Sequence, residues 1–338
     1  MSTAAISYGS DLSGLICGYL FRPDAVARSL TSLEVEDWIH GRTPSQADEF
    51  IWLHFNLANS ASEKWLRRHI ELSDVFYDTL HEGTRSTRIE YADNALIAVL
   101  NDVLFDFSFD ASDISTLWLT VNERIVISAR TKPLLSVDRL REAVKRGETL
   151  RSSAELLIHL LRDEADVLIQ IVRDIAANVD NVEDHLLSNR IERNRSNLGN
   201  WRRLLLRLQR LLAPEPAALF RLLNRPPIWM AEHDVLDLRQ STEEFSTVLR
   251  DMSSLQERIK LLQEEIAAQI NEQNNRSLFV LTIVSVLVLP INIISGLMGM
   301  NVGGVPFNQE PEGFWIVVSI AIGLTFAAGW WAFRKTVD

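Results

Sequence analysis

The sequence predicts an α+β membrane protein, in which an N-terminal α/β/α domain is followed by a long stalk helix and two C-terminal transmembrane helices. Three observations support this class. Two apolar runs near the C-terminus each have about the 20 residues that a bilayer-spanning helix needs. A proline-free stretch with apolar residues at intervals of three and four precedes them. Strand-like and helix-like segments alternate over the first 150 residues.

In the N-terminal domain, residues 1–150, six segments rich in β-branched and aromatic side chains predict a mixed sheet. These segments are 15–21, 50–57, 88–91, 95–105, 117–121 and 125–129. Two amphipathic segments, 61–71 and 134–145, predict helices. The net charge of −11 lies almost wholly before residue 277, which argues against general nucleic-acid binding. Cys17 is the only cysteine, so an intrachain disulfide is excluded.

Helix is predicted throughout the stalk, residues 151–276, where strand signals are absent. Helices are expected near 152–188 and 195–212, ahead of a proline-rich break. From about residue 234 there is no proline before Pro290, and eight apolar residues recur at spacings of three and four. They form a heptad seam typical of a helix packed along its neighbours: Phe245, Val248, Met252, Leu255, Ile259, Leu262, Ile266 and Ile270. No stop signal separates this helix from the first membrane span.

The two predicted spans, residues 277–298 and 314–333, contain no ionisable side chain, which favours insertion into a bilayer. Lysine and arginine lie before the first span and after the second, but not in the loop 299–313 between them. By the positive-inside rule, the N-terminal domain and the tail 334–338 are expected in the cytoplasm. The N-terminal thirty residues have no sustained apolar core, so no secretory signal is expected there.

A polar face interrupts the first span. Its positions repeat at intervals of three, four and seven, which places them on one side of a helix: Asn275, Leu278, Thr282, Ser285, Leu289, Asn292 and Gly296. Ser295 is expected near this face. Polar groups in a bilayer face other helices or water, and two asparagines in register with Thr and Ser favour a water-lined pore. One hairpin cannot enclose a pore, so a ring of subunits is expected.

The tripeptide Gly299-Met300-Asn301 directly follows the first span, and Pro290 lies within that span. Together with the order of the domains, these residues resemble the CorA family of divalent-cation transporters. The resemblance implies a funnel-shaped homopentamer of the bacterial inner membrane. It also implies that the first span lines the pore and that Gly299, Met300 and Asn301 form its outer entrance.

The residues after the tripeptide indicate a branch of this family. Magnesium-transporting members usually continue with phenylalanine and, further on, Met-Pro-Glu, whereas this chain reads Val302-Gly303-Gly304-Val305-Pro306-Phe307. This is similar to the ZntB zinc-transporter branch, and it implies transport of Zn²⁺, with proton-coupled uptake favoured over efflux. No titratable group within the spans explains proton coupling.

The chemistry of the spans leaves a second ion choice open. They offer no His, Cys or carboxylate ligand, and oxygen ligands alone would not choose Zn²⁺ over Mg²⁺. A CorA-type channel for Mg²⁺, Co²⁺ or Ni²⁺ is therefore the alternative. A second alternative is a membrane-anchored sensor or scaffold, for which the polar face of the first span would have no use.

Two groups outside the spans could bind cations. Glu310 and Glu312 could capture cations at the pore mouth, or simply solvate the loop. Glu232, His233 and Asp234 bring possible zinc ligands together in the cytosolic part. Because adjacent helical residues point in different directions, a solvated helix face is the simpler interpretation of this second group.

The remaining features are assigned structural roles. His54 lies in an apolar run and is expected to be structural. Nine arginines between residues 190 and 225 are expected to pair with the acidic segments 174–183 and 243–264. The sequence contains no phosphate-binding loop, nucleophile elbow or metalloprotease motif, so neither enzymatic activity nor a cofactor is expected, with zinc present only as the transported ion.

Overall fold

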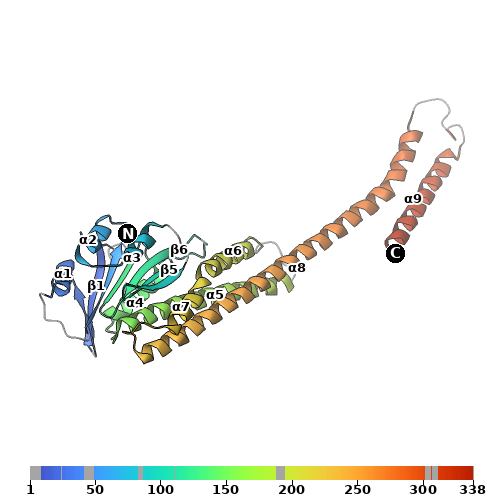
Figure 1. The fold of residues 1–338 in the computed structure, drawn as a ribbon. Coiled ribbons are helices and arrows are strands. Elements are labelled where there is room, and N and C mark those ends of the chain that lie inside the picture. The colour runs from blue at the N-terminus through green and yellow to red at the C-terminus, as the bar shows by residue number, and fades with distance from the viewer. Residues whose placement is uncertain are drawn as a thin grey trace. The chain divides into compact units, whose positions relative to one another are not determined.

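The computed structural model describes residues 9–23, 25–41, 49–82, 87–110, 112–187, 195–300, 306 and 311–337. The chain forms two compact units, residues 1–262 and 263–338. The first unit contains the α/β domain and most of the stalk, and the second contains the two apolar helices. The elements of both units are labelled in Figure 1.

The first unit is built on a seven-stranded mixed sheet in the order β2-β1-β3-β7-β6-β5-β4 (Figure 1). Its strands are β1 (Leu15–Arg22), β2 (Ala25–Leu30), β3 (Phe50–Asn56), β4 (Arg88–Ala92), β5 (Ala95–Val103), β6 (Ile114–Val121) and β7 (Ile125–Arg130). Within this sheet β3 and β7 pair in parallel, and the other neighbours pair antiparallel. All six predicted strands are present. The sequence pattern missed β2, because this edge strand is mostly exposed and buries only its last residue fully.

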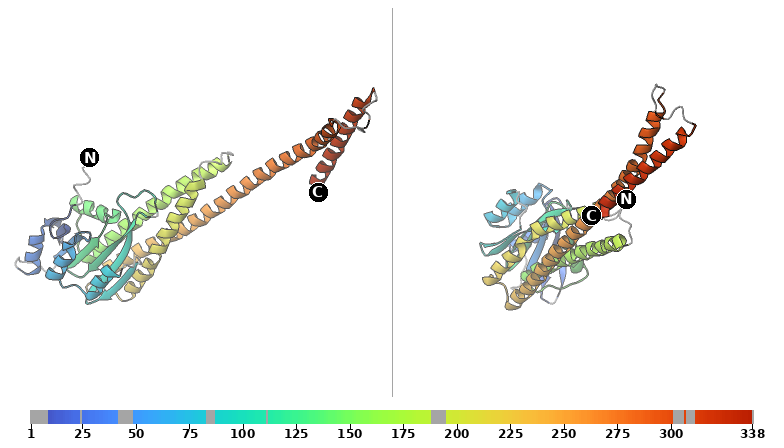
Figure 2. Two further views of the ribbon diagram at one scale, coloured as in Figure 1. Left: turned by 90° about the horizontal axis from the view of Figure 1, so that it is seen from above. Right: turned by 90° about the vertical axis from the view of Figure 1, so that its right-hand side faces the viewer.

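Helices cover both faces of the sheet, which confirms the α/β/α architecture (Figure 2). One face carries α1 (Ser32–Ile39), α2 (Ala61–His69) and α3 (Asp74–His81), and the other carries α4 (Leu135–Lys145), α5 (Ser153–Leu187) and α7 (Pro214–Asn224). Strand β3 shows the division clearly. Ile51, Leu53 and Phe55 join the core under α1–α3, whereas Phe50 and Trp52 join the core on the opposite face, as the two-residue period of a strand requires.

Three helices were not predicted. Helices α1 and α3 have eight residues each, too short for a clear periodic signal. For α1 the capping box formed by Thr31 and Glu34 was a usable start signal. The prolines at 214 and 216 were interpreted as a break, but α7 begins at Pro214, because a proline in the first turn of a helix loses no hydrogen bond.

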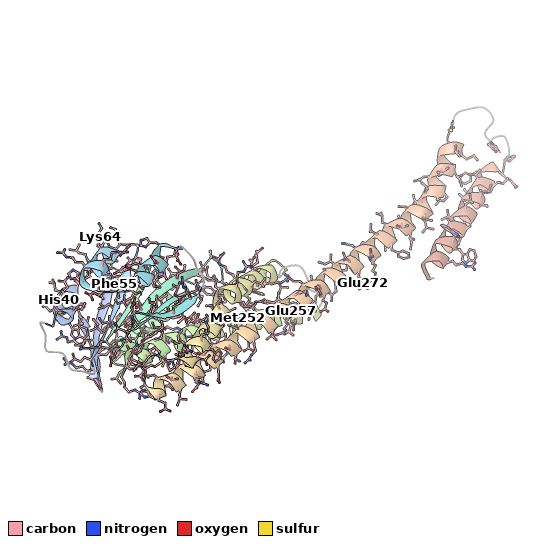
Figure 3. The ribbon with its side chains drawn as sticks, in the orientation of Figure 1. His40, Phe55, Lys64, Met252, Glu257 and Glu272 are labelled. Carbon is pink, nitrogen blue, oxygen red and sulfur yellow. The ribbon has the colours of Figure 1, made fainter. Side chains whose placement is uncertain are left out.

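The stalk contains α5, α6 (Arg195–Leu212) and the first part of α8 (Glu232–Met298), which enters the second unit at residue 263 and there continues through Pro290. Within the first unit, the six seam residues from Phe245 to Leu262 are all buried. Met252, labelled in Figure 3, is fully buried, whereas the nearby Glu257 is exposed. Arg258 of α8 pairs with Asp180 and Glu183 of α5, with Nη2–Oδ1 and Nε–Oε1 distances of 2.6 and 2.8 Å.

The second unit holds the end of α8 and α9 (Gly313–Val337), so both predicted apolar helices are present. Each contains an 18-residue window of high mean hydropathy, 2.5 in α8 and 1.8 in α9, and at most 6% of either window is buried in the protomer. Apolar helices this exposed are not core helices of a soluble unit. Phe314 and Trp315 begin α9, and Trp330 and Trp331 lie near its end, each exposed, as expected of interfacial anchors.

Candidate ion path along helix α8

All seven residues of the predicted pore face are exposed on α8. Helix α9 packs against α8 elsewhere: Leu287 Cδ2 lies 3.3 Å from where a Cβ on Gly329 would be, and Ile291 and Met298 line a groove shared with α9. Since each residue turns a helix by about 100°, Gly296 lies roughly 180° from Leu287. The polar face therefore points away from α9, and the other helix of the same hairpin leaves it uncovered.

The hydroxyl groups of this face keep their oxygens available. Thr282 Oγ1 donates its hydrogen to the Leu278 carbonyl oxygen and Ser285 Oγ donates to that of Leu281, both at 2.8 Å. These bonds satisfy the hydroxyl hydrogens inside the helix, as a bilayer requires. The oxygen lone pairs then remain free to accept from the water shell of a passing cation. Asn292 adds an amide that both donates and accepts.

Two small residues near the end of α8 differ from each other in their surroundings. A Cβ placed on Gly296 would meet no heavy atom of the described residues within 4 Å, so this position is open to close approach by another backbone. Ser295, expected near the polar face, is exposed and lies about 60° around the helix from Asn292, at the edge of that face. Ser295 lines the groove toward α9, because one turn along from Asn292 falls short of a full 360°.

The described part of the tripeptide lies just beyond the end of α8. The Gly299 N–H donates to the Ser295 carbonyl oxygen at 2.9 Å, and Met300 is half exposed. Asn301 and Glu310 lie outside the described residues. Glu312 is exposed, and its carbonyl oxygen accepts from the N–H groups of Trp315 and Ile316 in the first turn of α9. Its predicted role in cation capture stays a prediction.

The possible cytosolic zinc ligands do not converge. Glu232 is exposed, while Asp234 is 1% exposed at the start of α8. Asp234 accepts from Ser152 Oγ at 3.0 Å and lies 3.3 Å from His233 Nε2. No group of three His, Cys, Asp or Glu side chains among the described residues could hold a metal ion. The contacts of Asp234 instead fasten the start of α8 to the start of α5.

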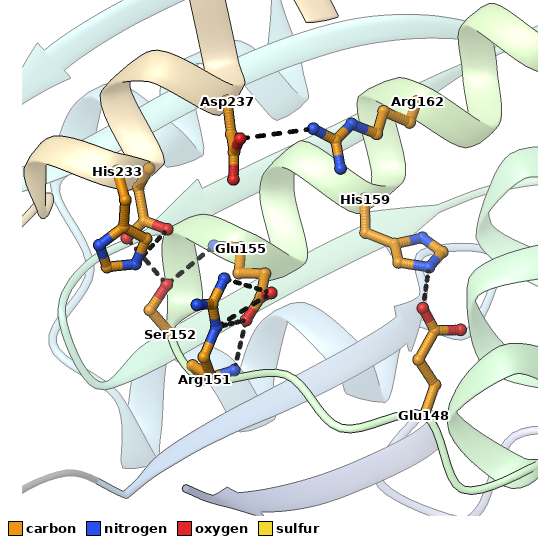
Figure 4. Close-up of polar contacts among 9 residues, drawn as sticks. Glu148, Arg151, Ser152, Glu155, His159, Arg162, His233 and Asp237 are labelled. Atoms are coloured by element: carbon orange, nitrogen blue, oxygen red, sulfur yellow. Dashed lines mark hydrogen bonds and ion pairs between the residues drawn. The ribbon is translucent and has the colours of Figure 1, made fainter. Parts of the chain in front are cut away.

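A second polar cluster beside this junction centres on His159 of α5 (Figure 4). His159 lies between two carboxylates, with Nε2 2.9 Å from Glu148 Oε1 and Nδ1 3.1 Å from Asp163 Oδ2. Hydrogen bonding to Asp163, opposed by partial burial and supported by both negative charges, raises the pKa of His159 to about 9. The imidazolium therefore holds α5 to the segment before it at neutral pH.

This arrangement predicts a pH-dependent loss of stability on the alkaline side. Because the folded-state pKa of His159 is raised, its contribution is complete below about pH 6.5 and disappears as the pH rises through about 9. We expect His159→Gln to lower the free energy of unfolding by about 1 kcal/mol at pH 7, a value reduced for solvent screening, and by almost nothing at pH 10. Chemical denaturation at both pH values measures this. His40→Gln, which replaces an exposed histidine just after α1 (Figure 3), is the control. Equal losses of stability in His159→Gln at pH 7 and pH 10 would contradict a stabilising role of charged His159.

His54 is structural in its contacts, as expected. It is 1% exposed; its Nδ1 lies 2.8 Å from Ser128 Oγ, and its Nε2 accepts from Arg130 Nε at 3.2 Å. Burial, together with the charges of Arg130 and Arg141, lowers the pKa of His54 well below its usual value. The arginines between residues 190 and 225 are expected to pair with acidic segments, but two of the acidic residues have another partner. Asp180 and Glu183 pair with Arg258 of α8. Arg203 donates to Asn200 within α6.

Sequence analysis missed a group of buried carboxyl groups in the first unit. Asp102 of β5 is 5% exposed, Glu164 of α5 is 3% exposed and Glu215 of α7 is 0% exposed. Asp102 accepts from the backbone N–H and the hydroxyl of Ser136 and from the Val103 N–H. Glutamate is common on exposed helix faces, so neither Glu164 nor Glu215 stands out in the sequence. The only hint in the sequence was that Glu164 comes shortly after the apolar-rich stretch at the start of α5.

Comparison with known proteins agrees with this architecture. A family model described as CorA-like Mg²⁺ transporter protein matches residues 47–335. The chain belongs to this family. A divalent cation transporter named CmaX from Pseudomonas aeruginosa is 30% identical over 96% of this chain and 97% of its own length. A zinc transport protein, ZntB from Pectobacterium atrosepticum, is 22% identical over 90% of this chain and 91% of its own.

The solved structure of full-length CmaX has the same fold as this CorA-family chain. It superposes with a TM-score of 0.82 and 27% identity, covering 97% of this chain and 99% of the CmaX chain. The order of α/β domain, long helix and two apolar helices is therefore that of the family. Identity to CmaX exceeds identity to ZntB, so family membership does not decide which divalent cation is carried.

Proposed function

We propose that this CorA-family protein transports divalent metal cations, with Zn²⁺ as its principal substrate, across the bacterial inner membrane. It acts as a homopentamer, with its N-terminal domain and C-terminus in the cytoplasm. The observation that carries the proposal is the polar face of α8, which is exposed, lies opposite α9 and runs along the otherwise apolar span 277–298. Five such faces turned toward a common axis would enclose a path for ions.

The chemistry of this face suits passage rather than tight binding. Hydroxyl and amide oxygens of Thr282, Ser285 and Asn292 accept hydrogen bonds from a hydrated cation but supply none of the ligands of a closed zinc site. Conduction needs binding that is weak and repeated. Leu278 and Leu289, on the same face and exposed, would form apolar constrictions that close the path by excluding water.

The choice of Zn²⁺ rests on the residues after the tripeptide and on the ZntB relatives. Mg²⁺ is the competing substrate, favoured by the description of the family model. Proton-coupled uptake is the proposed direction and mode of transport. The loop and the tripeptide would form the outer entrance, with Asn301 contacting the water shell of the arriving ion.

Flux into sealed liposomes that contain the purified full-length protein tests the proposal. A zinc-sensitive dye reports entry, in the presence and absence of excess Mg²⁺ and of an imposed pH gradient, and Asn301→Ala is the control. We expect Zn²⁺ entry that survives excess Mg²⁺, depends on Asn301 and increases with an inward proton gradient. Mg²⁺ entry without Zn²⁺ entry would assign the protein to the alternative substrate. No entry of either ion would favour a membrane-anchored scaffold.

A further inference from the structure

Two glutamates in the N-terminal domain are buried without the partners that a charged carboxylate requires. Neither oxygen of Glu215 has a hydrogen-bond partner, nor does Oε1 of Glu164, among the residues the structure describes. Both side chains are more than nine-tenths buried. Ionised carboxylates cannot be buried in this way without a large cost in free energy, so the geometry requires neutral carboxylic acids.

The carboxyl groups around this pair all raise the pKa of the two glutamates. The negative charges of Glu215 and Asp102 act on Glu164, and that of Asp102 acts on Glu215, so each additional negative charge disfavours the next. Arg139 of α4 is exposed and acts on Asp102, where it lowers the pKa, while Arg88 of β4 is exposed and paired with Glu82 and Glu90. Burial first, and these carboxyl groups second, raise the pKa of both glutamates above the usual 4.5.

We propose that Glu164 and Glu215 form a proton-binding site inside the N-terminal domain, and that loss of its protons as the internal pH rises regulates transport. The regulatory half of this inference rests on the proposed function. The proton-binding half does not, because it concerns only groups within the first unit.

The position of Glu215 explains how proton loss would be transmitted. It lies in the first turn of α7, whose buried face also carries Leu219, Leu222 and Leu223. These leucines pack in the same core as the apolar face of α5 and as Leu238 near the start of α8. Ionisation would repel α7 from α5 and draw water toward Glu215. Because only residues 225–231 separate α7 from α8, loosening the packing of α7 against α5 would release the start of the stalk helix.

Proton binding is measured by unfolding of the full-length protein in detergent between pH 5 and pH 9. The folded state binds more protons than the unfolded state above about pH 4.5, so stability falls as the pH rises. Each proton involved changes the unfolding equilibrium constant about tenfold per pH unit. We expect Glu215→Gln to reduce the pH dependence of the unfolding equilibrium constant by about tenfold per pH unit. If Glu215→Gln does not fold, Glu164→Gln is expected to have the same effect. Glu123→Gln, at an exposed site, should leave the slope unchanged.

Regulation is measured by cation flux in liposomes at internal pH 6.5 and 8.5. We expect wild-type flux to change severalfold between these values and Glu215→Gln flux to change little. Unfolding curves with the same pH slope in wild type and both glutamine variants would overturn the proton site. If the glutamine variants change the pH slope of unfolding but wild-type flux is the same at both internal pH values, the proposed regulation of transport is overturned. Absent wild-type flux at both pH values would refute the transport function instead, while the unfolding curves still decide the proton site.

Discussion

Replacing Asn292 by Leu is expected to reduce divalent-cation flux about tenfold or more while leaving the assembled protein intact. Asn292 is exposed on the polar face of α8, and leucine would remove a polar contact to the hydrated ion without disturbing the packing against α9. A loss of about 1.4 kcal/mol of stabilisation at the barrier already corresponds to a tenfold slower rate. Dye-reported flux measures the effect, and size-exclusion chromatography in detergent checks assembly.

A matched pair of serines on the same helix provides the control. Ser285 lies on the polar face, whereas Ser295 lines the groove toward α9. Ser285→Ala is expected to slow flux severalfold, because its hydroxyl oxygen is lost from the path. Ser295→Ala is expected to leave flux near wild type. Equal effects of the two substitutions would show that the polar face is not the ion path, and unchanged flux in Asn292→Leu would restore the scaffold alternative.

Replacing Leu262 by Ala is expected to destabilise the first unit by roughly 2–5 kcal/mol. Leu262 is 4% exposed in the seam of α8, so its truncation leaves a cavity that the helix cannot easily close. For a unit of this size the loss corresponds to a fall in the unfolding midpoint of about 2–4 °C per kcal/mol. Thermal unfolding of the full-length protein, followed by circular dichroism, measures it.

The adjacent leucine makes the comparison specific. Leu261 is 62% exposed on the same helix, and Leu261→Ala is expected to change the free energy of unfolding by less than about 0.5 kcal/mol. A large effect of Leu261→Ala together with a small effect of Leu262→Ala would mean that the seam of α8 faces the opposite way. Similar large effects of both would require a further partner on the outer side of α8.

The sequence was sufficient for the fold wherever periodicity is strong. The heptad positions from Phe245 to Leu262 are buried as predicted, because a repeat of three and four residues allows only one face of a helix to be apolar. Short elements escaped prediction for the opposite reason. Helix α3 has too few turns to establish a period, and edge strand β2 has too few buried residues to show alternation.

The candidate site was predictable in position but not in environment. Spacing alone places Thr282, Ser285 and Asn292 on one side of α8, but only the packing of α9 shows that this side faces away from α9. The same spacing did not show that Ser295 also lines the groove toward α9. Glu164 of α5 and Glu215 of α7 are 51 positions apart in the sequence, so no local sequence pattern predicts that both are buried.

The central claim, that ions pass along the polar face of α8, is tested most directly by cysteine substitution. Burial raises the pKa of the single native thiol, Cys17, to about 11, which makes it a poor nucleophile, and Cys17→Ala removes it entirely. In that background Ser285→Cys and Leu287→Cys are compared, with a small charged thiol reagent applied during flux. We predict rapid block of flux in Ser285→Cys and none in Leu287→Cys, which packs against α9. Block in Leu287→Cys with none in Ser285→Cys would contradict the account.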